Sequence, residues 1–287
     1  MPEKILIIGK GFLGNTIFKN ASEMGFQCIA TSFNSEPRLD ICNFDLINKY
    51  ISVFAPDYII NCAALTNVDK IETSPEMAYA VNSNGAKNIA MAAKKIDAVL
   101  VHISTDSVFD GKGSLYNEED IPHPINEYSK SKKLGEDFVN QFSNKFIIVR
   151  TNFYGYNSTG KFLFNWILDN LKNKIKFTAF SNVIFNPLEI NNLSQMILEL
   201  LHSNYYGLLH LSTDKMMSKF EFAKIVANSL NYNEKLVAKG KIEDSNLMAK
   251  RPLNTTLANN KVKRFLRTKP ISLNYWLENI FVKSKFH

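Results

Sequence analysis

The sequence predicts an α/β fold with a Rossmann-type, doubly wound parallel sheet and a smaller, discontinuous C-terminal lobe. Three observations lead to this class. Short β-branched runs alternate with amphipathic helical stretches through the first half of the chain. Residues 5–8 are continuously apolar and residues 99–103 are apolar except for His102, a pattern typical of strands covered by helices on both faces. A glycine-rich turn follows the first run directly, where a βαβ unit changes from strand to helix.

The first lobe is predicted to span residues 1–150 and to bind a dinucleotide. Its strands share a short, β-branched and apolar character and are expected at residues 4–8, 27–31, 57–61, 98–104 and 145–150. Helices are expected between these strands. The regular alternation of strand and helix ends near Arg150, which we take as the boundary of the lobe.

Residues 151–287 are expected to form mainly a substrate-binding lobe. Its elements are expected as a helix at 162–171, extended segments at 176–180 and 182–186, a helix at 190–201 and a helix at 219–230. Residues 208–211 resemble one more core strand, so the chain is predicted to return to the sheet near 207–212. The second lobe is therefore discontinuous.

Composition narrows the function classes. The 287 residues are 45% hydrophobic and 21% charged, and no window is apolar for long enough to cross a membrane. The net charge of +7 comes from scattered basic residues, so we expect no nucleic-acid and no membrane partner. Cys28, Cys42 and Cys62 form no Cys-x-x-Cys pair and lie in or near apolar stretches, like buried free thiols. We expect a cytoplasmic protein without a disulfide or a metal site.

The glycine-rich turn reads Gly9-Lys10-Gly11-Phe12-Leu13-Gly14. Glycine allows a tight turn, the approach of backbone N–H groups to a pyrophosphate and close packing of helix on strand, while a helix N-terminus favours an anion. The residues expected to hold the diphosphate of NADPH or NADH are Gly9, Gly11, Phe12, Leu13 and Gly14.

The end of the second strand distinguishes the two cofactors. An NAD site usually has Asp or Glu there to bind the ribose hydroxyls, whereas this chain has Thr31-Ser32-Phe33-Asn34. Ser32 and Arg38 are available to a 2′-phosphate, so the sequence favours NADPH over NADH. Glu36 keeps the alternative open, because a bent loop could return its carboxylate to the ribose.

Three polar residues point to a carbonyl reduction. Thr105 follows the fourth strand, where the carboxyl edge of a parallel sheet meets a ligand crevice. Tyr128 and Lys132 lie four residues apart near the start of a helix, so their side chains share one face. Hydride addition leaves negative charge on the carbonyl oxygen, which Tyr128 can protonate while Thr105 donates a hydrogen bond. Lys132 is expected to lower the pKa of the tyrosine, which is ordinarily about 10.

These motifs resemble the extended short-chain dehydrogenase/reductase superfamily and, within it, the dTDP-4-dehydrorhamnose reductase family. The similarity spans nearly the whole chain and rests on residues 61–69, 80–82, 104–111, 128–132, 150–151 and 251–254. It implies reduction of the 4-keto group of a nucleotide-linked 6-deoxyhexulose, in the synthesis of an activated deoxysugar for surface polysaccharide. The expected partner is the nucleotide-sugar substrate, and a homodimer is one expected assembly.

The resemblance also implies roles for individual residues. Ala63 and Ala64 would line the cofactor, Asp40 and Ile41 would flank its adenine, Thr66 and Val68 would approach the sugar, and Thr105, Tyr128 and Lys132 would form the catalytic triad. Phe153 would lie near the sugar. Arg251, which precedes a proline in a polar loop, offers a guanidinium for the substrate diphosphate.

The chain departs from the family pattern at three places. Gly9 and Gly11 are one residue closer than usual, Ser107 stands where rhamnose-forming reductases carry tyrosine, and Phe153 stands where they carry tryptophan. The last two positions approach the sugar, so the identity of the hexulose stays open. Two other functions also stay open: an epimerase or dehydratase of a nucleotide sugar, and a non-catalytic NADP-binding regulatory subunit.

Overall fold

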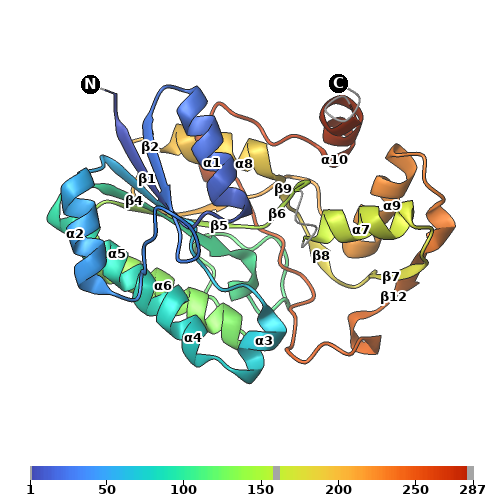
Figure 1. Cartoon of the computed structure of the whole chain (residues 1–287). Helices are drawn as coiled ribbons and strands as arrows, with labels where there is room; N and C mark the ends of the chain where they lie inside the picture. Colours follow the sequence, from blue (N-terminus) through green and yellow to red (C-terminus); the bar gives the residue numbers. More distant parts are fainter. Residues whose placement is uncertain (1, 158–161, 283–287) are drawn as a thin grey trace.

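A six-stranded parallel sheet forms the centre of the first lobe (Figure 1). The computed structural model describes residues 2–157 and 162–282. The strands are β1 (Lys4–Ile8), β2 (Gln27–Thr31), β3 (Tyr58–Asn61), β4 (Val99–Thr105), β5 (Phe146–Thr151) and β10 (Gly207–Leu211). All pairs are parallel, and the order across the sheet is β10-β5-β4-β3-β1-β2. The predicted Rossmann-type fold is confirmed, and each of these strands lies within one residue of its expected bounds.

The sheet has a switch point beside β1. The strands β2 and β3 lie on opposite sides of β1, so the chain crosses over β1 between them. In parallel α/β sheets such a reversal opens a ligand crevice at the carboxyl ends of the strands. The glycine-rich turn follows β1 at this edge, and the loop after β3 lies next to it.

Helices cover both faces of the sheet. One face carries α2 (Phe44–Phe54), α5 (Ala86–Lys95) and α6 (Glu127–Phe142), and the other carries α1 (Phe12–Glu23) and α8 (Ile190–Leu200). Strand β1 contributes side chains to the cores on both faces of the sheet. Leu6 and Ile8 pack toward the first face, and Ile5 and Ile7 pack toward the second. Burial on both faces explains the apolar runs in the sequence.

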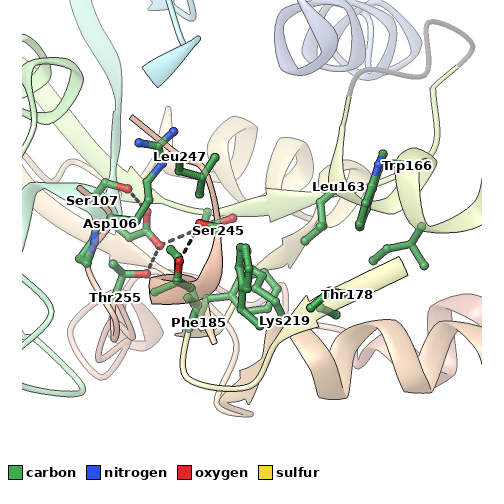
Figure 2. Close-up of a pocket in the computed structure, with 18 of the residues that line it drawn as sticks. Asp106, Ser107, Leu163, Trp166, Thr178, Phe185, Lys219, Ser245, Leu247 and Thr255 are labelled. Atoms are coloured by element: carbon green, nitrogen blue, oxygen red, sulfur yellow. Dashed lines mark hydrogen bonds between the residues drawn. The ribbon is translucent and has the colours of Figure 1, made fainter. Parts of the chain in front are cut away.

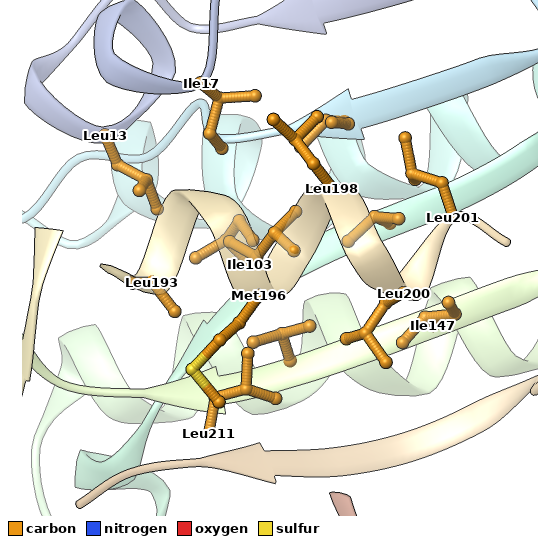
Figure 3. Close-up of a cluster of buried hydrophobic side chains, with 14 of the residues drawn as sticks. Leu13, Ile17, Ile103, Ile147, Leu193, Met196, Leu198, Leu200, Leu201 and Leu211 are labelled. Atoms are coloured by element: carbon orange, nitrogen blue, oxygen red, sulfur yellow. The ribbon is translucent and has the colours of Figure 1, made fainter. Parts of the chain in front are cut away.

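Helix α8 belongs to the core of the first lobe, although it lies after residue 150. Figure 3 shows Leu198 of α8 near Ile17 of α1, while Met196 and Leu200 of α8 point toward Leu211 and Ile147 of the sheet. The chain therefore returns to the first lobe with α8 as well as with the predicted strand β10. The returning segment is longer than the sequence indicated.

The second lobe has its own aromatic core. Its larger elements are α7 (Leu163–Lys172), β7 (Phe177–Phe180), α9 (Lys219–Ser229), β12 (Val237–Gly240) and α10 (Leu273–Trp276). Phe164, Phe222 and Trp276 are fully or almost fully buried among them. Strand β7 pairs in parallel with β12, which lies about sixty residues later in the chain. The division of binding roles between the two lobes stays a prediction. The predicted lobes also include residues 1, 158–161 and 283–287, which lie outside the described part of the chain.

Shorter elements complete both lobes. They are α3 (Val68–Thr73), α4 (Glu76–Ala78), the π-helical turn η1 (Tyr79–Gly85), η2 (Asp106–Val108), β6 (Phe153–Tyr154), β8 (Ile184–Phe185), β9 (Leu188–Glu189), β11 (Met217–Ser218), η3 (Glu234–Leu236), η4 (Ile242–Asp244), η5 (Val262–Arg264) and η6 (Leu277–Phe281). No helix in the described residues is long and apolar enough to cross a membrane.

The three cysteines are unpaired, but one of them corrects an expectation. Cys28 and Cys62 are partly buried in the first lobe, whereas Cys42 is exposed. Cys42 lies at the protein surface, in the turn that precedes α2. The prediction of a buried thiol is therefore wrong for Cys42, because an apolar neighbour in sequence does not place a turn residue in the core.

Candidate active site

The loop between β1 and α1 approaches the loop after β3 very closely. Gly9 has a φ of +105°, and a Cβ there would lie 2.6 Å from the backbone nitrogen of Ala63. A Cβ at Gly14 would overlap the carbonyl oxygen of Gly9, so glycine lets α1 begin this close to the sheet. Gly11, the N-cap of α1, faces open space instead. The three glycines thus fit a cradle for the diphosphate of NADPH, with its open side at the helix N-terminus.

Phe12 and Leu13, the other two residues expected to hold the diphosphate, contribute differently. Leu13 is buried in the first-lobe core, so only its backbone faces the cradle. The ring of Phe12 packs against Phe162 at the start of α7, with 4.9 Å between ring centres. Phe12 therefore joins the cradle to the second lobe.

The loop after β2 carries the residues expected to distinguish NADPH from NADH. The Arg38 guanidinium lies 4.8 Å from the centre of the Phe33 ring. Ser32 Oγ accepts a hydrogen bond from the backbone nitrogen of Ser35 at 3.0 Å. The Glu36 carboxylate accepts one from the backbone nitrogen of Arg38, also at 3.0 Å, and the loop lines a cavity of about 370 Å³. Glu36 is thus bound to its own loop, which favours Arg38 over Glu36 as the residue available to a ribose phosphate.

The next two expected cofactor residues face in different directions. Asp40 accepts a hydrogen bond from the backbone nitrogen of Cys42 at 2.9 Å and is partly exposed. Ile41 is buried, and a Cβ at Gly85 would touch its side chain at 2.6 Å. Any contact between Ile41 and an adenine would therefore involve its backbone.

Asn82 fixes the loop that contains Ala63 and Ala64. Its side chain accepts a hydrogen bond from the Leu65 nitrogen at 2.8 Å and donates to the Leu65 carbonyl at 3.0 Å. The same amide donates to Ser131 Oγ of α6 at 3.0 Å. Asn82 lies in the π-helical turn η1, a distortion often found at functional sites. It holds this loop at a fixed position relative to the helix that carries Tyr128.

Thr105, Tyr128 and Lys132 meet at the carboxyl end of β4. Helix α6 begins at an N-cap, Asn126, whose side chain accepts a hydrogen bond from the Ser129 nitrogen at 2.9 Å. The Thr105 hydroxyl lies near enough to the Tyr128 phenol to affect its pKa. Lys132 is buried one turn further along α6. The structure brings the three predicted catalytic residues together.

The pKa values of this group differ from the sequence expectation. Burial raises the pKa of Tyr128 to about 12; the Thr105 hydroxyl opposes the increase and the Asp106 carboxylate adds to it. Burial lowers the pKa of Lys132 to about 8, against the attraction of Glu136. The Lys132 ammonium donates to the Ile103 carbonyl at 2.7 Å. Desolvation of the phenolate dominates, so the net change in the tyrosine pKa is upward, and the prediction that Lys132 lowers it stays a prediction.

A buried ion pair lies behind these residues. Arg150 on β5 donates to both carboxylate oxygens of Glu136 on α6, with Nε–Oε1 and Nη2–Oε2 distances of 2.9 and 2.7 Å. The two side chains are 3% and 4% exposed. Ser104 Oγ donates to the same carboxylate at 2.5 Å. This pair locks β4, β5 and α6 together beneath the catalytic residues.

Asp106 connects the catalytic strand to the rest of the site. Its Oδ1 accepts hydrogen bonds from the hydroxyls of Thr105 and Ser107, both at 3.2 Å. Its Oδ2 accepts from the Asn152 amide at 2.8 Å and from the Thr255 hydroxyl at 2.6 Å. All four donors are neutral, and they fill the acceptor positions of a carboxylate that is 2% exposed.

A cleft of about 620 Å³ opens beside Asp106 and Ser107, a size typical of small-molecule sites (Figure 2). Both lobes contribute to its walls. The second lobe supplies Leu163, Trp166 and Ile167 from α7, Thr178, Ala179 and Phe180 from β7, Phe185, Lys219, and several residues between 242 and 255. The end beside Asp106 is polar, and the end near Trp166 is largely apolar.

Arg251 lines the cleft but is already bound. Its Nη2 forms an ion pair with Asp69 Oδ2 at 3.0 Å, and its Nη1 donates to the Ala249 carbonyl at 2.9 Å. Asp69 Oδ1 in turn accepts from the backbone nitrogens of Met248 and Ala249, at 3.1 and 3.0 Å. Arg251 therefore holds the loop of residues 248–251 against α3. Its contact with the substrate diphosphate, expected from the sequence, stays a prediction.

Three residues expected near the sugar lie outside the cleft lining. Phe153 packs against the first-lobe core, Thr66 is exposed, and Val68 begins α3. None of them is among the residues that line the cleft. Their predicted contact with the sugar stays a prediction.

The sequence did not single out several residues that line the cleft. Asn152 and Thr255 each lie one residue beyond a family-like segment, so extending those segments would have included them. Trp166 and Lys219 carry no sequence signal, since an aromatic residue in a helix and a lysine at a helix start are common in any protein. Only the packing of the second lobe brings them to the site.

Comparisons with known proteins agree with this geometry. A family model described as the RmlD substrate binding domain matches residues 3–285. The chain is 31% identical to a dTDP-4-dehydrorhamnose reductase of Aggregatibacter actinomycetemcomitans, over 96% of this chain and 98% of that protein. A crystal structure of dTDP-4-dehydrorhamnose reductase from Bacillus anthracis in complex with NADP is 32% identical, with a TM-score of 0.89, over 99% and 100% of the two chains. Methionine adenosyltransferase 2 subunit beta of Rattus norvegicus is 28% identical, over 91% and 81%.

Proposed function

Because this chain belongs to the RmlD substrate binding domain family, we propose that it reduces the 4-keto group of a nucleotide-diphospho-6-deoxyhexulose with NADPH. The relatives named dTDP-4-dehydrorhamnose reductase support a dTDP-linked substrate and a role in deoxysugar synthesis for surface polysaccharide. One observation carries the proposal: Thr105 lies near the Tyr128 phenol at the end of β4, and the next two residues, Asp106 and Ser107, line the cleft.

Each group has a role in this reaction that follows from its position. Gly9, Gly11 and Gly14 would hold the diphosphate of NADPH, which supplies hydride when bound. Tyr128 keeps its proton at neutral pH because its pKa is raised, so it can give that proton to the carbonyl oxygen. The Thr105 hydroxyl donates to Asp106 Oδ1 in this structure, and by rotating away from that carboxylate it can donate to the same oxygen.

Lys132 and Asp106 hold the acid in position. The Lys132 ammonium is held by the Ile103 carbonyl, so its positive charge stays close to Tyr128, one turn away on α6. Asp106 fixes Thr105 from the other side through its Oδ1. Protonated Lys132 favours the phenolate that remains after proton transfer, and this lowers the energy of the transition state.

The two alternatives predict different stoichiometry. An epimerase or a dehydratase regenerates its nicotinamide in each cycle, so it consumes no NADPH overall. A regulatory subunit binds NADP without turnover. The family includes a relative named as a subunit, methionine adenosyltransferase 2 subunit beta, so this alternative needs a direct test.

A screen of NADPH oxidation with dTDP-, UDP- and GDP-4-keto-6-deoxyhexoses tests the proposal. We expect one NADPH to be oxidised for each hexulose reduced, with dTDP as the preferred nucleotide. Product formed without NADPH oxidation would favour an epimerase or a dehydratase. Tight NADPH binding with no turnover of any hexulose would favour the regulatory subunit. A homodimer and a cytoplasmic location stay predictions.

A further inference from the structure

Lys219 places an ammonium group in the cleft. It is the first residue of α9, and its Nζ lies 3.2 Å from the centre of the Phe185 ring. Among residues 2–157 and 162–282, no carboxylate lies within 4.0 Å of this ammonium, and the aromatic ring is the contact that holds it. An ammonium without an anion inside a cleft is costly for a folded protein.

The nearby charged groups of the cleft do not satisfy Lys219. Asp106 is close enough to attract the ammonium, but its two oxygens already accept four hydrogen bonds from neutral groups. The other cation of the cleft, Arg251, is paired with Asp69. Lys219 is therefore the cation in the described cleft that has no ionic partner, and an anionic ligand would supply one.

The position of Lys219 along the cleft indicates which part of a ligand it meets. Figure 2 shows Lys219 between the polar end at Asp106 and Ser107 and the opposite end at Trp166. The sugar must lie at the polar end, because Thr105 is hydrogen-bonded to Asp106 and lies near Tyr128. The nucleoside then extends toward Trp166, whose indole offers a surface for a base. The diphosphate joins these two parts.

We propose that Lys219 binds the diphosphate of the nucleotide-sugar substrate and that it, more than Arg251, sets the affinity for the charged part of the ligand. The proposal rests on the function proposed above, because it requires a substrate that carries a diphosphate. Arg251 then acts mainly by holding residues 248–251 against α3, and Lys219 provides the ionic contact.

Calorimetric titration with dTDP, thymidine and NADPH tests this role. Lys219→Met keeps the length of the side chain and removes its charge, while Lys219→Arg retains the charge. Lys224→Met is a matched control, since Lys224 lies on the same helix, outside this cleft, and pairs with Glu234 at 2.7 Å.

We expect Lys219→Met to weaken dTDP binding by about 10- to 100-fold, as expected for the loss of a charged hydrogen bond. Lys219→Arg should stay within about threefold of wild type, and Lys224→Met within about twofold, as for a partly exposed ion pair outside the cleft. Thymidine has no phosphate, so its binding should change little in any variant. NADPH affinity should also be unchanged, because the cradle lies in the first lobe.

Three outcomes would overturn the inference, and they differ in what else they affect. Unchanged dTDP affinity in Lys219→Met would refute the ionic contact and leave the proposed reductase intact. Equal losses for thymidine and dTDP would show that Lys219 acts through the shape of the cleft. Failure of the wild-type protein to bind dTDP, UDP or GDP would reject both this inference and the proposed substrate class.

Discussion

Two regions of the molecule hold buried charge in opposite ways. Behind the catalytic residues, Arg150 and Glu136 form a bidentate ion pair that Ser104 completes. In the site, Lys132 donates to a carbonyl group and Lys219 packs on an aromatic ring, and neither has a carboxylate within 4.0 Å among the described residues. The first region satisfies its charges within the protein. The second leaves them available to ligands.

The difference separates stability from function. A paired buried charge is costly to break, because the partner is left without compensation. An unpaired charge in a cleft lowers stability while the site is empty of anions, and the ligand repays this cost when it binds. Substitutions behind the site should therefore lower stability. Substitutions in the site should change rate or affinity, and removal of an unpaired charge there should raise stability.

The largest expected effect is on rate. Tyr128→Phe keeps the ring and removes the proton that the carbonyl oxygen takes, so single-turnover reduction at saturating NADPH should fall by about 10²–10⁴. Thermal stability and NADPH affinity should stay close to wild type. Tyr79→Phe is a matched control, because that phenol donates to Glu127 and lies outside the catalytic group. Retention of more than about a tenth of the wild-type rate would exclude Tyr128 as the main proton donor.

The second effect is on stability. Glu136→Gln retains the shape of the side chain but leaves the Arg150 guanidinium buried without its anion, which should lower the free energy of unfolding by about 3–5 kcal/mol. Urea denaturation measures this loss. Asp137→Asn on the same helix is the control, since Asp137 is 57% exposed and pairs with Lys133 at the surface. Its loss should stay below about 1 kcal/mol. Equal losses in the two variants would contradict the comparison.

The third effect is a gain in thermal stability, opposite to the loss expected for Glu136→Gln, and it depends on pH. Burial lowers the pKa of Lys219 to about 7, against the attraction of Asp106, so folding penalises its charged form. The penalty is complete below pH 7 and declines as the pH rises toward the ordinary lysine pKa of about 10.4. Lys219→Met should therefore raise the Tm by about 2–4 °C at pH 6 and by less at pH 9. A lower Tm in this variant at pH 6 would mean that Lys219 stabilises the protein.

The smallest effect concerns cofactor preference. Arg38 is exposed at the loop after β2, so Arg38→Ala should weaken NADPH binding by about two- to fivefold and leave NADH binding unchanged. Fluorescence titration with both cofactors gives the ratio. Arg264→Ala, an exposed arginine elsewhere on the surface, should change neither affinity. A parallel loss of NADH affinity would assign Arg38 to loop structure instead of the 2′-phosphate.

The sequence by itself determined the elements and the residues whose chemistry depends on local spacing. Periodicity located the strands, and the positions of Gly9, Gly11 and Gly14 predicted a cradle whose tight contacts the structure contains. The four-residue spacing of Tyr128 and Lys132 placed both on one face of α6. These features follow from short-range geometry, which the order of residues alone defines.

Only the tertiary structure decided how charges are paired and where the cleft lies. Asp106 and Thr255 are bonded across 149 positions of the chain, and Arg251 reaches back to Asp69. Lys219 enters the cleft because β11 and α9 fold against β8, far from the catalytic strand in sequence. The raised pKa of Tyr128 likewise depends on burial by distant segments. Long-range packing fixes desolvation and ionic partners, and no local pattern in the sequence encodes either of them.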